Sequence, residues 1–181
     1  MVTYKELLQK QLVKKLEKVE KEKYVLFHLD NYKIDLDSSE PFMRLGNPKY
    51  TVIAGYYAML NATLWNFAKH FNLKMSEKDI GVHTNCLIVL DEVVKDKKRK
   101  EQIIRLLEEA KVEFNSFTIL KKNSEETLPL MLRHCAEKRK KYIYYSTERN
   151  LPKSDDRLNE AKNFIDTVVK PYVSMMEKLK C

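Results

Sequence analysis

The 181-residue sequence predicts an all-α protein, an antiparallel bundle of about six helices in a single domain spanning residues 1–181. Apolar residues recur at steps of three and four over long stretches, which is the period of amphipathic helices. Only 3 residues are Gly and 5 are Pro, too few for the many tight turns of a sheet protein. Hydrophobic residues make up 44% and charged residues 33%, a balance typical of a globular chain.

The N-terminal part predicts one helix and a long connection. Leu8, Leu12, Leu16 and Val19 are spaced by four, four and three residues, so a helix is expected over residues 3–27. We treat residues 1–28 as an accessory helix. Residues 29–47 are expected to form a connection, because polar and turn-forming residues gather there.

A central helix is predicted to begin at Asn47-Pro48, an N-cap residue followed by proline at the first helical position. Its expected inner stripe consists of Ile53, Tyr57, Leu60, Leu64, Phe67 and Phe71. Small residues lie beside that stripe, namely Ala54, Gly55, Ala58 and Ala62. Small side chains let a partner helix approach closely, so this helix is expected at the centre of the core.

The remaining chain predicts further helices and no strand. Ser76 with Asp79 resembles a capping box for a helix with inner residues Val82, Cys86, Leu87, Leu90 and Val94. After a basic hinge at residues 95–100, a helix with inner residues Ile103, Leu107, Ala110, Phe114 and Phe117 is expected to end near residues 121–124.

Another helix is predicted to open at Ser124, before a linker at residues 150–156. The last helix has expected inner residues Leu158, Ala161, Ile165, Val168, Tyr172, Met176 and Leu179, and Pro171 should kink or interrupt it.

Composition bounds the possible functions. The formal net charge of +8 attracts phosphates and other anions, although a lysine-rich helical surface also accounts for it. Cys86, Cys135 and Cys181 are widely spaced, so neither disulfides nor a zinc site is predicted, and free thiols suit a cytoplasmic protein. No stretch has the length and apolarity of a membrane span, and we expect no membrane association.

Familiar catalytic motifs are absent. The sequence has no GxGxxG or GxxxxGK[ST] phosphate loop and no HExxH, so no cofactor and no metal are predicted. The histidines His28, His70, His83 and His134 are well separated, and each is more readily explained as a surface or capping residue than as a ligand.

The segment MLRHCAEKRKKYIYYSTER, residues 131–149, combines cations with tyrosines. Its cations include Arg133, Lys138, Arg139, Lys140 and Lys141, and its rings include Tyr142, Tyr144 and Tyr145. Cations contact phosphates, and aromatic faces stack on unpaired bases. The segment is therefore the candidate surface for RNA or a nucleotide, with a plain solvated basic face as the alternative.

Three pieces, in order, resemble the HEPN family of small helical-bundle proteins. They are AGYYAMLNATLWNFAKHFNL from Ala54, VHTNCLIVLDEVV from Val82 and EKRKKYIYY from Glu137. The Tyr-Tyr-Ala-Met run is similar to the hallmark helix of that family. The resemblance covers residues 48–180 and implies a HEPN-like four-helix core with additional helices, among them residues 97–123.

The resemblance also implies function. HEPN proteins are typically homodimers, and many are metal-independent endoribonucleases in toxin–antitoxin or defence systems, some paired with a nucleotidyltransferase-type antitoxin. The nuclease branch has an Arg followed, after four to six residues, by a His. Arg139 matches the Arg, but Tyr144 stands at the His position, and tyrosine, with a pKa near ~10, is a poor base at neutral pH.

Three functions follow from these observations. The first is binding of RNA or a nucleotide through the segment at Arg139–Tyr145. The second is an endoribonuclease in which Arg139 and Tyr144 act together, with His83 or His134 supplying the acid or base. The third is a non-catalytic protein-interaction module.

Overall fold

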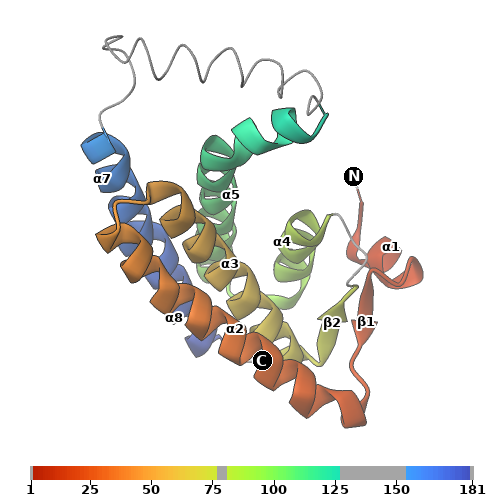
Figure 1. The fold of residues 1–181 in the computed structure, drawn as a ribbon. Coiled ribbons are helices and arrows are strands. Elements are labelled where there is room, and N and C mark those ends of the chain that lie inside the picture. Colours follow the sequence, from red (N-terminus) through yellow and green to blue (C-terminus); the bar gives the residue numbers. More distant parts are fainter. Residues whose placement is uncertain (1, 77–80, 127–153, 180–181) are drawn as a thin grey trace.

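The computed structural model describes residues 2–76, 81–126 and 154–179, which form a helical bundle with one small two-stranded sheet (Figure 1). The predicted all-α class is confirmed. In chain order the elements are α1 (Tyr4–Gln9), β1 (Val13–Lys15), α2 (Lys18–Arg44), α3 (Pro48–Asn66), η1 (Phe67–Phe71), β2 (Leu73–Met75), α4 (Val82–Val93), α5 (Lys97–Glu126), α7 (Ser154–Phe164), η2 (Ile165–Val169) and α8 (Lys170–Lys178).

Helix α3 lies at the centre and contacts α2, α5, α7 and α8 (Figure 1). Its start is as predicted, because the Asn47 side chain accepts a hydrogen bond from the Tyr50 amide and Pro48 occupies the first turn. The stripe predicted to face inward is wrong in part: Tyr57 is exposed, whereas Val52 and Met59 are fully buried. The helix is covered on most sides, so no single apolar stripe marks its buried face.

Helix α3 packs closely against η2 at Gly55. A Cβ atom on Gly55 would lie 2.6 Å from Cδ1 of Ile165 and 2.9 Å from Cγ2 of Val169, both in η2. The small residues beside the predicted stripe therefore face partner helices, as their size suggested: Ala54, Ala58 and Ala62 are also buried.

The single helix predicted over residues 3–27 is wrong. Helix α1 ends at Gln9, and Gln11 has a left-handed backbone with φ of 56°. The chain then enters β1, which pairs antiparallel with β2, so that Val13 lies opposite Met75. The predicted leucine stripe spans three different elements, because pairing with a segment about sixty residues away is a non-local interaction that local periodicity does not reveal.

The connection predicted at residues 29–47 is also wrong, because α2 continues to Arg44. Its serines lie within the helix, and their hydroxyls donate hydrogen bonds to preceding carbonyl oxygens, Ser38 to Ile34 and Ser39 to Leu36. Tyr32 is buried, and its hydroxyl donates a 3.1 Å hydrogen bond to Glu177 of α8. Tertiary packing thus stabilises a helix whose local sequence favours turns.

The helices that follow agree with prediction in their inner faces. In α4 Cys86 and Leu90 are buried, and in α5 Ile103 and Leu107 are buried. The cap predicted from Ser76 and Asp79 falls partly outside the described residues. The helix start predicted at Ser124 is wrong, because α5 runs unbroken to Glu126 and no Gly or Pro precedes that residue to end it.

The last helix is interrupted near Pro171, as predicted, by a π-helical turn between α7 and α8. The wider π-helical turn η2 directly precedes α8, which has Pro171 in its first turn. Proline lacks an amide hydrogen, and a π-helical turn accommodates the missing backbone bond. The end of α8 is held by Asn66 of α3, whose side-chain amide donates to the carbonyl oxygens of Met176 (2.7 Å) and Leu179 (2.9 Å).

Candidate functional site

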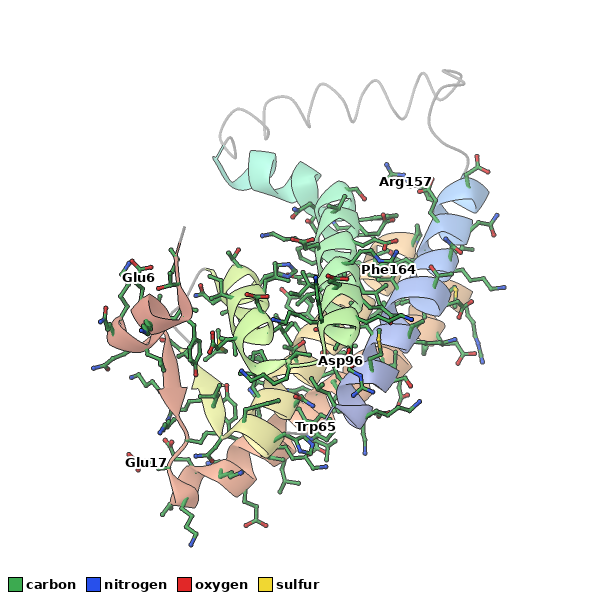
Figure 2. All side chains as sticks on the ribbon, turned by 180° about the vertical axis from the view of Figure 1, so that it is seen from behind. Glu6, Glu17, Trp65, Asp96, Arg157 and Phe164 are labelled. Atoms are coloured by element: carbon green, nitrogen blue, oxygen red, sulfur yellow. The ribbon has the colours of Figure 1, made fainter. Side chains whose placement is uncertain are left out.

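The basic and tyrosine-rich segment lies outside the described residues. This applies to Arg133, His134, Lys138, Arg139, Lys140, Lys141, Tyr142, Tyr144 and Tyr145, and to the helix predicted to carry them. The described elements on either side are α5, which ends at Glu126, and α7, which begins at Ser154. The Arg157 guanidinium in the first turn of α7 lies 5.2 Å from the centroid of the Phe117 ring in α5, so one cation–ring contact links these two helices; Figure 2 labels Arg157 at the start of α7.

His83, the other predicted acid–base residue, is described, and it lies in the first turn of α4. Its Nδ1 atom and the hydroxyl of Tyr56 in α3 are hydrogen-bonded at 2.9 Å. The two rings stack with an interplanar angle of 17°, and Phe114 of α5 stacks on Tyr56 with a centroid distance of 4.3 Å. The Tyr-Tyr-Ala-Met run and the helix that opens around a His therefore meet in the core.

The electrostatics of this cluster keep the histidine neutral. Burial, helped by the nearby Lys111 ammonium, lowers the pKa of His83 from 6.5 to about 4. Burial likewise raises the pKa of Tyr56 far above its usual value of 10. The Nε2 atom of His83 is buried and has no hydrogen-bond partner among the described residues. The imidazole is therefore uncharged at neutral pH.

This geometry bears on the prediction that His83 supplies a catalytic acid or base, which stays a prediction. The side chain is 8% exposed, Nδ1 is hydrogen-bonded to the Tyr56 hydroxyl, and Nε2 is buried, so in this conformation His83 packs in the core beside Tyr56. The sequence signal that explains His83 is its apolar surroundings in VHTNCLIVL, which indicate a core position. The second tyrosine of the pair, Tyr57, is exposed and packs edge-on against Phe114.

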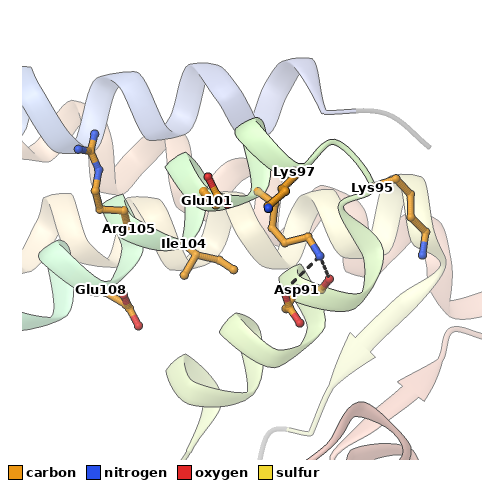
Figure 3. A pocket seen from close by; sticks show the side chains of 8 residues that line it. Asp91, Lys95, Lys97, Glu101, Ile104, Arg105 and Glu108 are labelled. Carbon is orange, nitrogen blue, oxygen red and sulfur yellow. Dashed lines mark hydrogen bonds and ion pairs between the residues drawn. The ribbon is translucent and has the colours of Figure 1, made fainter.

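A surface pocket of about 570 Å³ lies where α4 meets α5 (Figure 3). It is lined by Asp91, Lys95, Lys97, Lys100, Glu101, Ile104, Arg105 and Glu108. On one side of the pocket the Lys100 ammonium forms an ion pair of 3.1 Å with the Asp91 carboxylate and donates a hydrogen bond to the backbone carbonyl oxygen of Asp91. Carboxylates interleave with the cations, so this part of the predicted basic hinge lacks the single-sign surface that attracts phosphate.

Two further observations concern metals and membranes. Among the described side chains, no three His, Cys, Asp or Glu residues gather closely enough to hold a metal ion. No helix in the described ranges is both long enough and apolar enough to cross a bilayer.

Comparisons with protein-family models, with curated proteins and with solved structures found no match to this chain.

Proposed function

We propose that this protein binds RNA or a nucleotide through residues 131–149, with Arg139 making the oriented contact to phosphate. The observation that carries the proposal is the density of cations and tyrosines in that segment of a chain with a net charge of +8. A guanidinium presents a planar fork to two phosphate oxygens, whereas the lysines nearby attract the anion without fixing its orientation. Tyrosine faces supply stacking surfaces for unpaired bases.

The HEPN resemblance supports the same proposal and suggests its setting. A HEPN-like chain would act in the cytoplasm as a homodimer, within a toxin–antitoxin or defence system and alongside a nucleotidyltransferase-type antitoxin. We propose binding ahead of cleavage for two reasons. First, Tyr144 stands where the nuclease branch has His. Second, His83, the described histidine that was predicted to supply an acid or base, is buried in the core, and its pKa is lowered to about 4.

The first prediction concerns Arg139. Arg139→Ala is expected to weaken binding of a fluorescein-labelled single-stranded RNA, or of labelled ATP, by about tenfold in fluorescence anisotropy, because one charge-assisted bidentate contact is lost. Arg44→Ala removes the same charge from an exposed position on α2 and is the matched control. Equal affinity of Arg139→Ala and the control, or no binding to either probe at low salt, would contradict the proposal.

Salt and metal dependence separate binding from cleavage. Affinity for RNA should fall as salt rises, with a slope of about −0.7 per neutralised phosphate for a single strand. RNA incubated with the protein in EDTA should stay intact. Cleavage that persists in EDTA and is lost in Arg139→Ala would establish the endoribonuclease instead, with Arg139 stabilising charge on the phosphate.

A further inference from the structure

Helix α2 carries apolar side chains on its outer face, away from α3. Val19 is 93% exposed, Phe27 59%, Ile34 61% and Leu26 49%. Spacings of seven and eight residues place these four side chains along one side of the helix. Figure 1 shows α2 lying across the outside of the bundle, with its other side towards α3. Exposed apolar side chains that line up in this way mark an interaction surface.

The charges on the same face indicate what covers it. Glu20, Lys23, Asp30 and Lys33 are all exposed and alternate in sign along the helix. An interfacial membrane helix has a predominantly basic polar face, which α2 lacks. Lys23 and Asp30 take part in no ion pair within the described part of the chain. Both charges are therefore available to a protein partner.

The face is complementary to itself. When two copies of α2 run antiparallel about a two-fold axis between Leu26 and Phe27, Leu26 faces the partner's Phe27 and Val19 faces the partner's Ile34. In that register Lys23 faces the partner's Asp30. By symmetry each of these contacts occurs twice.

The second charged pair agrees with this register. Glu20 faces the partner's Lys33, although Glu20 already accepts a hydrogen bond of 2.5 Å from Lys74. Moving the axis to Asp30 would oppose that residue with itself and would bring Glu20 against the partner's Glu40. Like charges directly opposite each other are destabilising, so the axis between Leu26 and Phe27 is favoured.

We infer that α2 forms the interface of the homodimer proposed above, pairing antiparallel with α2 of a second copy about a two-fold axis. The paired stretch from Val19 to Ile34 is about 24 Å long at ~1.5 Å per residue. This is short for an interface, so dissociation in the micromolar range is expected. The inference rests on the proposed homodimer but not on residues 131–149, so its failure would leave the RNA-binding proposal unaffected.

Sedimentation equilibrium of the full chain, from low to high micromolar concentration, tests the apolar contact. Ile34→Glu is expected to make the protein monomeric, because it places a charge opposite the partner's Val19. Val112→Glu is the matched control, since Val112 is a β-branched residue on α5 that is 68% exposed. It should leave the dimer unchanged. Circular dichroism melting checks that both variants fold.

The register is tested by a charge swap. Lys23→Glu and Asp30→Lys should each weaken dimerisation by about tenfold, because each variant creates a like-charge contact twice. The double variant K23E/D30K should restore the wild-type dissociation constant. The two residues are seven positions apart, about 10 Å along one helix, so they do not compensate within a single chain. A monomer at every concentration, a dimer indifferent to Ile34→Glu, or a double variant without recovery would each overturn the inference.

Discussion

Acidification from pH 7 to pH 4 is expected to remove about 3 kcal/mol of stability through His83 alone. In the unfolded chain the imidazole takes up a proton near pH 6.5, whereas the folded protein resists protonation until about pH 4. The unfolded state therefore binds more protons between these values. The contribution of His83 is fully present above pH 6.5, falls as the pH drops, and is lost below about pH 4.

The physical cause is local. Protonation would place a charge beside Tyr56 and under the influence of the Lys111 ammonium, in a position where Nε2 has no hydrogen-bond partner among the described residues. Urea unfolding followed by circular dichroism at a series of pH values gives the stability curve. Comparison with His83→Phe isolates the histidine, because carboxylates that titrate in the same range are common to both proteins.

His83→Phe should show a shallower loss of stability between pH 7 and pH 4, even though its stability at pH 7 falls because Tyr56 loses its partner. Lys111→Met is a second check: removal of the like charge should raise the pKa of His83 and reduce the loss on acidification. Parallel pH profiles for the wild type and His83→Phe would contradict the assignment of a buried neutral imidazole.

Gly55→Ala is expected to lower the free energy of unfolding by about 2 kcal/mol, although alanine is the better helix former by about 1 kcal/mol. The added methyl group would lie 2.6 Å from Cδ1 of Ile165 and 2.9 Å from Cγ2 of Val169. The isoleucine end is flexible, but the valine is stiff at its branched carbon, so α3 and η2 must separate slightly. The change in the denaturation midpoint measures the cost.

The matched test is compensation by Ile165→Val, which deletes the Cδ1 atom nearest to the new methyl group. In the double variant the cost of Gly55→Ala should fall by about 1 kcal/mol relative to its cost in the wild type, because the two changes share one space. Strict additivity of the two single variants, or a Gly55→Ala protein more stable than the wild type, would show that the helices do not approach as closely as described.

These two predictions bear on the same stretch of sequence. Gly55 directly precedes the Tyr-Tyr-Ala-Met run and Tyr56 opens it; both are buried, Gly55 against η2 and Tyr56 against His83. The exposed neighbour Tyr57 shows that one of two adjacent identical residues faces solvent. Residue type alone does not distinguish Tyr56 from Tyr57, because the positions of the helices packed against α3 decide which side of α3 is buried.

Local sequence patterns correctly predicted several features of this protein. The helical class followed from the spacing of apolar residues, the start of α3 from Asn47 and Pro48, and the inner residues of the last helices from steps such as Ile165, Val168 and Tyr172. These signals act over three or four residues, the distance over which a helix repeats. These signals can therefore be recognised without knowing which distant segments pack against the helix.

Tertiary structure decided what depends on distant partners. The pairing of β1 with β2, the contact of Tyr32 in α2 with Glu177 in α8, and the enclosure of His83 beside Tyr56 all join residues far apart in sequence. Burial and pKa are properties of those contacts, so a sequence pattern that marks His83 as a possible acid or base carries no information on whether solvent reaches it. Sequence by itself determined a basic all-helical chain, and only the packing around α3 decided which polar groups are enclosed.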